Sequence, residues 1–390
     1  MDVIAVDRDP QAVGFPLADE RAVLSTEDEE GIERLARARG VHGLVSPGAD
    51  WPVGIAARVA ERIGVPHPVE ARVAALATSK LRQRDAFAAA GVPHARSLAA
   101  DDPSLAFPCV VKAPDRQGQR GLGLVRGREE LDAALAEAAA ESRAGSVLVE
   151  ELIVGPELTV NAFSFDGDVV PLTVTDRLTA EPPAFGVALA HLWPSEHAAA
   201  AAAVDVARAA VEAVGIRNGP SYTQLRLGPD GPVVMEVAAR LGGGHDAELC
   251  RAALGVDLNA LAVEAALGSD PTRGLTPWGL TPAMLAGLRR GRASRGSDPF
   301  GVRPRGAAVV FLVPPAGRLV AVDGVHEAEA GDGIEWIRVY RRPGHVFGEL
   351  RRGADRAGAV LATGADRDEA LARARRAADA VRFRVDADAP

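Results

Sequence analysis

The segment 222–238 constrains the fold more than any other part of the chain. Two runs of alternating apolar residues, 222–227 and 232–238, flank the sequence Gly-Pro-Asp-Gly at 228–231. Such a turn between alternating runs predicts a β-hairpin. Alternation with period two places one set of side chains on a buried face of the hairpin. The expected buried set is Leu225, Leu227, Val233, Met235 and Val237.

The opposite face of this hairpin carries polar side chains that suit metal and phosphate chemistry. If the turn centres on Asp230, Gln224 and Glu236 are directly opposed, with Cβ atoms about 5 Å apart. Two oxygen-bearing side chains at that spacing can share Mg²⁺ or Mn²⁺, which also binds nucleotide phosphates. Arg240, just past the strand, can hold a carboxylate or an acyl phosphate bidentately. The alternative is a polar face exposed to water.

Lysine is rare in this chain. Only two of its 44 basic residues are lysines, Lys80 and Lys112. This bias indicates that lysine survives where a compact ammonium cannot be replaced by a planar guanidinium, with chance survival as the alternative. Lys112 follows a predicted apolar strand at 107–111, and a glycine-rich loop at 115–123 leads to a second strand at 124–125.

This glycine-rich loop joins two strands. A Walker A loop instead runs from a strand into a helix and ends in Gly-Lys-Ser/Thr, which occurs nowhere in the chain. The free backbone N–H groups of Gly118, Gln119 and Gly121 could cover a polyphosphate, with a lysine beside them to neutralise charge. Glycines between strands also form simple turns, and this alternative stays open.

A third candidate segment is the acidic end of a predicted strand at 147–153. If this segment is a nucleotide hinge, Glu150 would accept a hydrogen bond from the adenine amino group. The backbone of Glu151 and Ile153 would contact the edge of the base. Glu157 would then bind ribose hydroxyls. Surface acids at a strand end are the alternative.

The remaining pattern predicts an α/β chain. Residues 1–76 alternate between strands and helices, as in half of a doubly wound parallel sheet. No glycine-rich turn follows the first strand, so we expect either a short domain or a start upstream of Met1. The predicted elements of this part are strands at 3–6 and 41–45 and helices at 27–39 and 53–63.

Further elements follow, in order, as far as residue 380. They are helices at 79–90 and 129–141, a hairpin of 158–165 with 169–175, a long helix capped by Ser195 and ended by Gly215, a helix at 246–254, strands at 307–313, 335–340 and 359–362, and a final helix at 366–380. We interpret 176–195 as an irregular stretch of the kind that forms lids, and 269–304 as a linker.

Composition excludes several classes of protein. A net charge of −9 argues against a nucleic-acid partner, and no apolar run approaches the ~20 residues that span a bilayer. The N-terminus does not have the pattern of a signal peptide. Cys109 and Cys250 lie in apolar surroundings and read as buried small hydrophobes. We therefore expect a cytoplasmic protein with neither membrane nor nucleic-acid partners.

Taken in order, the segments over 78–260 resemble the ATP-grasp superfamily. The matching residues are Thr78-Ser79-Lys80, the strand and loop at 107–123, Val149 to Glu157, Gln224, and Glu236 to Gly243. Within that superfamily the chain is most similar to L-amino acid ligases of the bacilysin-synthetase type. The tail 305–383 resembles their C-terminal domain, notably at 356–360.

The resemblance implies an ATP-grasp fold, with mixed α/β and α+β parts. It implies a preATP-grasp domain at 1–76, an ATP-grasp domain at 77–268 with a lid at 107–147, a linker at 269–304 and a C-terminal domain at 305–390. The implied activity is ADP-forming ligation of a small-molecule carboxylate to an amine through an acyl phosphate. An enzyme that activates bicarbonate and an ATP-binding scaffold are the alternatives. Relatives are often dimers, so a homodimer is one expected state.

Carried over by residue, the resemblance places Lys80 and Lys112 on the phosphates of ATP and Glu236 on Mg²⁺. It places Glu150, Glu151 and Ile153 at the adenine and Glu157 at the ribose, and Arg240 on the acyl phosphate. Two positions depart from the family pattern. Gln224 stands where the first metal-binding carboxylate is usual, and Ala238 stands where an asparagine is usual, so we expect weaker metal binding.

Substrate contacts are less well specified by the sequence. The glycines at 242–244 precede a helix, so their N–H groups could receive a carboxylate, whereas Asp246 reads as the N-cap of that helix. His245 is either a substrate contact or a solvated loop histidine. Arg177 begins the irregular stretch and is a second candidate.

Overall fold

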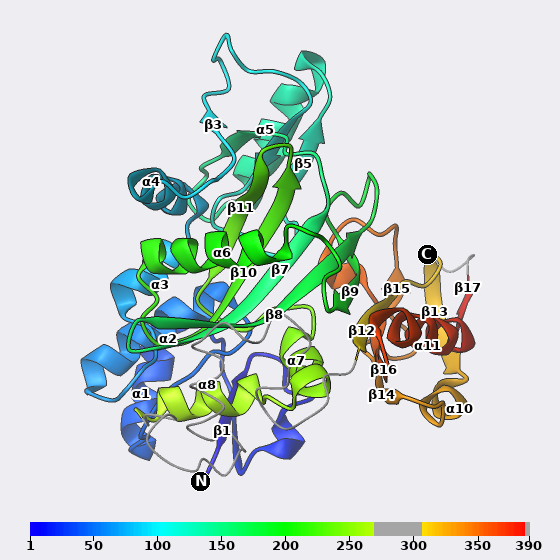
Figure 1. Cartoon of the computed structure of the whole chain (residues 1–390). Coiled ribbons are helices and arrows are strands. Elements are labelled where there is room, and N and C mark those ends of the chain that lie inside the picture. Colours follow the sequence, from blue (N-terminus) through cyan, green and yellow to red (C-terminus); the bar gives the residue numbers. More distant parts are fainter. Residues whose placement is uncertain (269–305, 387–390) are drawn as a thin grey trace.

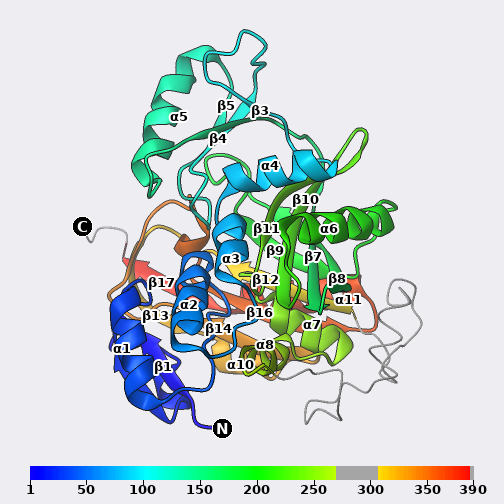
Figure 2. The ribbon, with the colours of Figure 1, turned by 90° about the vertical axis from the view of Figure 1, so that its left-hand side faces the viewer.

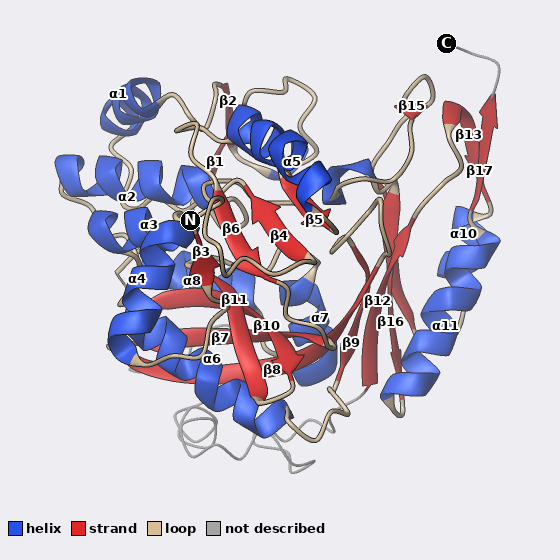
Figure 3. Cartoon of the chain, turned by 90° about the horizontal axis from the view of Figure 1, so that it is seen from above, coloured by secondary structure: helices blue, strands red, loops and turns tan. Residues whose placement is uncertain are grey.

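An eight-stranded sheet organises the protein, whose computed structural model describes residues 1–268 and 306–386. Its strand order is β11-β10-β7-β8-β9-β12-β16-β14, and every neighbouring pair is antiparallel. Figure 3 shows this sheet running across the molecule. The strands are β7 (Glu157–Phe165), β8 (Asp168–Thr179), β9 (Ala188–Trp193), β10 (Gly219–Gly228), β11 (Gly231–Ala238), β12 (Gly306–Leu312), β14 (Ile334–Val339) and β16 (Gly358–Gly364).

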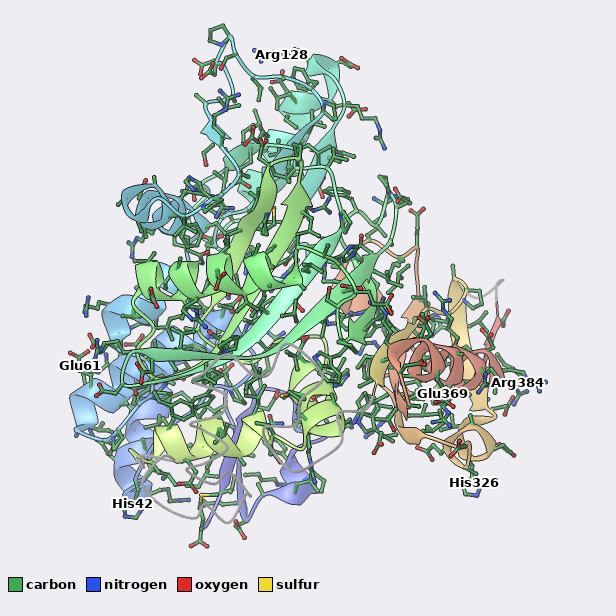
Figure 4. All side chains as sticks on the ribbon, in the orientation of Figure 1. His42, Glu61, Arg128, His326, Glu369 and Arg384 are labelled. Carbon is green, nitrogen blue, oxygen red and sulfur yellow. The ribbon has the colours of Figure 1, made fainter. Side chains whose placement is uncertain are left out.

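Helices cover both faces of this sheet. On one face, α7 (Asp246–Leu254) and α8 (Leu258–Ala266) bury a core that extends from β7 to β16. On the other face, α6 (Ala200–Val214) packs over β10 and β11, while α11 (Arg367–Ala380) packs over β12 and β16. Glu369 on α11, labelled in Figure 4, is partly exposed and pairs with Arg373 of the same helix at 3.0 Å.

The C-terminal segment continues the central sheet. β12 pairs with β9 from Ala307 opposite Trp193 to Val310 opposite Ala190. The boundary expected near residue 305 therefore falls inside one hydrogen-bonded sheet, and the division into domains stays a prediction. The linker expected at 269–304 lies outside the described residues. A smaller sheet, β15-β13-β17, completes the C-terminal part and was not predicted. It comprises β15 (Val346–Phe347), β13 (Gly317–Asp323) and β17 (Arg382–Asp386), with the short helix α10 (Val325–Glu329) between β13 and β14.

A four-stranded sheet lies above the central one, with the strand order β3-β6-β4-β5 (Figure 2). Its helix α5 (Arg128–Glu141) covers one face and buries Cys109 and Leu131. The glycine-rich loop joins β4 to β5, as predicted. The strands are β3 (Ser97–Leu98), β4 (Cys109–Lys112), β5 (Leu122–Val125) and β6 (Leu148–Glu151).

The N-terminal part contains two parallel strands and a layer of helices. These are β1 (Ile4–Asp7), β2 (Glu20–Val23), α1 (Glu29–Arg39), α2 (Asp50–Ile63), α3 (Ala71–Ala77) and α4 (Lys80–Ala90). The predicted strand at 41–45 is wrong, and the sequence missed β2. Val41 and Leu44 pack against Ala36 and Ile55 between α1 and α2, so their apolar character serves helix packing and not a ladder.

Two more predictions around the central sheet are wrong. Residues 176–195 are irregular only in part, because β8 extends to Thr179 and β9 is held between β8 and β12, which leaves 180–187 without a strand or helix. Ser195 does not cap α6, which begins at Ala200. The Ser195 hydroxyl instead accepts from the backbone of His197 in the preceding turn.

The register of the first predicted hairpin is confirmed in part. Gln224 and Glu236 are opposed across β10 and β11, as expected. A bulge after Gln224 shifts the remaining ladder by one residue, so Leu225 lies opposite Val234. Val234 is consequently buried, and Val233 and Met235 are only partly buried. Among the described helices, none has both the length and the apolar character needed to cross a membrane.

Replacing Leu361 with alanine tests the continuity of the sheet. Leu361 in β16 is 2% exposed and shares one core with residues of α7. We expect Leu361→Ala to lower the free energy of unfolding by about 2–5 kcal/mol in a single urea transition. The control Val320→Ala, at a 52% exposed position in β13, should change it by less than about 0.5 kcal/mol. A separate early transition of the C-terminal part alone would contradict the continuous core.

Candidate functional site

Lys80 and Glu236 form an ion pair between the first residue of α4 and strand β11. Lys80 Nζ lies 2.9 Å from Glu236 Oε2, and it also donates to the backbone carbonyl of Arg116 at 2.8 Å. Ser79 fixes the start of α4 by accepting from the backbone N–H of Arg82. One ammonium group thereby joins a helix, the central sheet and the glycine-rich loop.

Lys112 lies at the end of β4 and is paired with Glu150 on the adjacent strand β6. The Glu150 carboxylate is 1% exposed and is shared between Lys112 and Arg84. Burial would raise the pKa of Glu150, but the charges of Lys112 and Arg84 lower it. Burial lowers the pKa of Lys112, and Glu150 opposes that shift. The Glu150 carboxylate, expected at the adenine, therefore faces two cations.

The two lysines and Glu236 belong to one charged cluster. Burial alone would raise the pKa of Glu236, but Lys80, with Arg240 and Lys112 nearby, lowers it to about 2. Lys112 in turn experiences the charge of Lys80. Lys112 therefore lies near the Lys80–Glu236 pair, and the expected contact of all three groups with one triphosphate stays a prediction.

Arg240 is held by Asp50 of the N-terminal part, a contact that the sequence did not reveal. Its Nε lies 2.5 Å from Asp50 Oδ1, and its Nη1 donates to the carbonyl of Leu241 at 2.8 Å. Its guanidinium carbon also lies 5.6 Å from the centre of the Tyr222 ring. Burial would lower the pKa of Arg240, but Asp50 raises it. In the sequence, Asp50 looks only like an acidic residue at a helix start.

Glu157 is the centre of a second buried network. Its carboxylate accepts from Arg177 and Gln224, and Arg226 Nη2 lies 3.2 Å from its other oxygen. Burial would lower the pKa of Arg177, but Glu157 raises it. The carboxylate expected at the ribose is thus occupied by three side chains, and Arg177 is a buried ion-pair partner.

The arrangement fits Mg²⁺ bound through few protein ligands. Among residues 1–268 and 306–386, no cluster of three or more His, Cys, Asp or Glu side chains is arranged to hold a metal. Mg²⁺ commonly keeps several waters and takes one or two carboxylates together with substrate phosphates. Glu236 and the opposed Gln224 suit this mode, because Gln224 donates through Nε2 and keeps Oε1 free as an acceptor.

A cavity of about 600 Å³ adjoins the Lys80–Glu236 pair. It lies between the N-terminal part and the glycine-rich loop. The loop is joined to α2 where Gln117 Oε1 accepts from the backbone N–H of Asp50 at 2.9 Å. The charged residues that line the cavity include Asp50, Lys80, Arg116, Arg120, Arg143 and Glu236. A space of this size and polarity suits a charged small molecule.

The glycine-rich loop has the backbone geometry that its sequence suggests. Gly118, Gln119 and Gly121 all have positive φ, at 70°, 63° and 63°. A Cβ atom at Gly121 would lie 3.0 Å from the Cβ atoms of Ala113 and Glu141, so this position requires glycine. None of the three lines the cavity, and their contact with phosphate stays a prediction.

The remaining predicted residues lie outside the charged cluster. Glu151 Oε1 accepts from the backbone of Arg96 at 2.8 Å, and the carbonyl of Ile153 accepts from Arg226 at 3.2 Å. The His245 ring hydrogen-bonds to the Tyr340 hydroxyl and lies 4.8 Å from the Trp336 ring. His245 is therefore part of an aromatic group in the C-terminal part.

The prediction that Asp246 is the N-cap of α7 is wrong. His245 occupies the N-cap position, and Asp246, at 0% exposure, lies 3.0 Å from His191 Nδ1. Asn161 and the backbone N–H of Gly244 also donate to Asp246. Burial would raise the pKa of Asp246, but His191 and these donors lower it to about 2.

Two families of known domains match the chain. Residues 105–248 match the ATP-grasp domain, and residues 310–386 match the L-amino acid ligase C-terminal domain 2. The chain therefore contains an ATP-grasp domain over 105–248 and an L-amino acid ligase C-terminal domain over 310–386. The predicted fold class and resemblance are thus confirmed.

Solved structures share this fold. The L-amino acid ligase from Bacillus licheniformis has a TM-score of 0.77 at 22% identity, covering 95% of this chain and 89% of that one. The biotin carboxylase domain of the Hydrogenobacter thermophilus 2-oxoglutarate carboxylase, in complex with MgADP and bicarbonate, has a TM-score of 0.73 at 17% identity, covering 99% and 86%.

Sequence relatives include enzymes named for different reactions. The formate-dependent phosphoribosylglycinamide formyltransferase of Burkholderia vietnamiensis is 29% identical, covering 98% of this chain and 89% of its own. Carnosine synthase 1 of Gallus gallus is 29% identical over 49% of this chain. The chain spans only 22% of the length of carnosine synthase 1. An uncharacterized protein of Sinorhizobium fredii is 27% identical over 79% of this chain, which spans 61% of the length of that protein.

Replacing Asp246 with asparagine tests the buried His191–Asp246 pair. The folded pKa of Asp246, about 2, lies below the usual 3.8. The stabilisation is therefore complete above about pH 4 and is lost as the pH falls toward 2. We expect Asp246→Asn to lower the free energy of unfolding by roughly 2–3 kcal/mol at pH 7, measured by urea titration.

The difference between the wild type and Asp246→Asn should shrink as the pH falls from about 4 to 2. Asp205→Asn, at a 76% exposed side chain on α6, is the matched control and should match the wild type at each pH. A difference that is constant across this pH range would show that the Asp246 carboxylate charge does not stabilise the fold.

Proposed function

We propose that the protein is an ATP-dependent carboxylate–amine ligase that releases ADP and phosphate. The observation that carries the proposal is the Lys80–Glu236 ion pair at a charged cavity, with Lys112 close enough for its charge to act on both groups and with the glycine-rich loop beside the cavity. Two ammonium groups and one carboxylate at such a place suit a nucleotide triphosphate with its Mg²⁺. The ATP-grasp domain and the ligase-type C-terminal domain support the same activity.

Each charged residue has a separate task in this proposal. Lys80 and Lys112 neutralise the phosphates, and the buried Glu150 orients Lys112 through their ion pair. Glu236 and the Oε1 atom of Gln224 would hold Mg²⁺, which would neutralise phosphate charge. The backbone of Glu151 and Ile153 lies at the end of β6, where we place the adenine.

The reaction begins when a carboxylate oxygen of the first substrate attacks the γ-phosphate of ATP and ADP leaves. The amine of the second substrate then attacks the carbonyl carbon of the acyl phosphate, loses a proton and expels phosphate. Arg240, oriented by Asp50 and Leu241, stabilises the oxyanion of the adduct. Closure of the glycine-rich loop keeps water from hydrolysing the intermediate.

The relatives support small-molecule substrates. Their names specify an L-amino acid ligase, a carnosine synthase and a phosphoribosylglycinamide formyltransferase. We propose an amino acid or a similar small carboxylate as the acid. Cytoplasmic localisation and a homodimer stay predictions.

ADP release against a panel of amino acids and simple carboxylates, with Mg²⁺ and an amine, tests the proposal. ADP release that requires both acid and amine, with the amide detected by mass spectrometry, is the expected result. ATP binding without stimulation by any pair would instead favour the ATP-binding scaffold. ADP release that requires bicarbonate would favour the bicarbonate-activating alternative.

Replacing Lys112 with methionine tests the phosphate site. We expect Lys112→Met to lower kcat/KM for ATP by at least about 100-fold, because a neutral side chain no longer stabilises the transferring phosphoryl group. Glu150 keeps Arg84 as its partner, so the variant should fold, which circular dichroism checks. Arg126→Met, at an exposed position after β5, is the control. Near wild-type ADP release by Lys112→Met would contradict the assignment.

A further inference from the structure

Arg356 is partly buried and differs from the buried arginines near the site. Arg84, Arg177 and Arg240 each form an ion pair with a carboxylate. Arg356 forms no ion pair within the described residues and donates only to the carbonyls of Gly353 and Ala188, at 2.8 and 3.3 Å. A cation withdrawn from water without a counter-ion costs free energy.

The surroundings of Arg356 hold its guanidinium in one orientation. Its carbon lies 3.6 Å from the centre of the Phe311 ring, which places the planar group against the aromatic face. A guanidinium has five N–H groups, and two of them serve the backbone carbonyls. The remaining N–H groups of Arg356 are not among the buried donors that lack a partner, so they can be reached by solvent or by a ligand. The residue is therefore a rigid, accessible and uncompensated donor.

The electrostatics agree with this geometry. Burial lowers the pKa of Arg356 to about 10, and Arg177 adds to the lowering. Arg177 and Arg240 show the opposite direction, because Glu157 and Asp50 raise their pKa values above the usual one. An anion beside Arg356 would supply the compensation that the protein itself does not.

Arg356 also lies near the glycine-rich loop, although it does not line the cavity beside Lys80. A Cβ atom at Gly353 would be 3.3 Å from Arg356 Nη2 and 3.4 Å from Oε1 of Gln119, in the glycine-rich loop. Tyr222 contributes to the electrostatic surroundings of Arg356, and the ring of Tyr222 lies 5.6 Å from the Arg240 guanidinium carbon.

We propose that Arg356 binds the carboxylate of an amino acid that serves as the amine substrate. The inference rests on the proposed function. The reacting carboxylate of the first substrate loses its charge when it is phosphorylated, whereas the carboxylate of an amine substrate stays charged throughout. A permanent cation matches a permanent anion. Glu157 already compensates Arg177, whereas Arg356 has no carboxylate partner among the described residues, and a single guanidinium suits a monoanionic carboxylate better than a phosphate dianion.

The test compares an amine that carries a carboxylate with its uncharged amide and with an amine that carries a phosphate monoester. Wild-type protein and Arg356→Gln are assayed with L-alanine, L-alaninamide and phosphoethanolamine as amines, at saturating ATP, Mg²⁺ and one acid. We expect Arg356→Gln to raise KM for L-alanine by about 10- to 100-fold and to leave KM for L-alaninamide unchanged. The kcat for L-alaninamide should also stay unchanged. Arg352→Gln, at an exposed position of the same segment, is the control and should match the wild type.

Three outcomes would overturn the proposal. An equal change for L-alanine and L-alaninamide would show that Arg356 supports the structure and not the carboxylate. Preference for phosphoethanolamine that disappears in Arg356→Gln would assign the site to a phosphate monoester. No effect of the substitution, with turnover intact, would also overturn it without affecting the proposed ligase function.

Absence of turnover with every acid and amine would instead contradict the proposed function. Calorimetric titration of L-alanine into the protein with ADP and Mg²⁺ then decides the binding claim separately. Binding by the wild type that is lost in Arg356→Gln supports the carboxylate site. No binding by the wild type, or equal binding by both proteins, overturns it.

Discussion

Charge compensation between a few carboxylates and many cations determines how the site is built. Glu236, Glu150 and Glu157 each form an ion pair with at least one lysine or arginine. The three carboxylates lie on three different strands, β11, β6 and β7. Removing one carboxylate would leave buried cations unpaired, which costs more than the pair contributes. The cluster therefore ties the central sheet, the four-stranded sheet and α4 into one arrangement that two separate apolar cores could not specify.

The balance of charge also explains the tolerance of Gln224. A carboxylate at position 224 would face Glu157 and Glu236 together, whereas the amide donates to Glu157 and keeps one oxygen for a cation. Arg177 and Arg226 add positive charge on the same side. Gln224 thus provides a hydrogen bond that orders Glu157, in place of a second carboxylate opposite Glu236.

Much of this site follows from local sequence, and its partners do not. The turn at 228–231 and period-two alternation predicted the register that opposes Gln224 and Glu236, and the scarcity of lysine singled out Lys80 and Lys112. The bulge after Gln224 changed the buried set, because the pattern does not show where an extra residue enters a ladder. Asp50 meets Arg240 from 190 residues away, and single-sequence periodicity contains no information on such a contact. Asp246 is mistaken for a helix N-cap for the same reason, because its partner His191 lies 55 residues earlier in the chain and local sequence does not reveal that pair.

The N-terminal part completes the site through Asp50 and its neighbour Trp51. The backbone of Asp50 contacts the glycine-rich loop through Gln117, and its carboxylate holds Arg240. Arg143, at the far end of the four-stranded unit, stacks 4.3 Å from the Trp51 ring and pairs with Glu27 at 2.6 Å. Both contacts cross the same cavity. If the four-stranded unit moved away from α2, the cavity would open and the backbone N–H of Asp50 would lose its hydrogen bond to Gln117. The position of the loop and the orientation of Arg240 therefore both depend on Asp50, the first residue of α2.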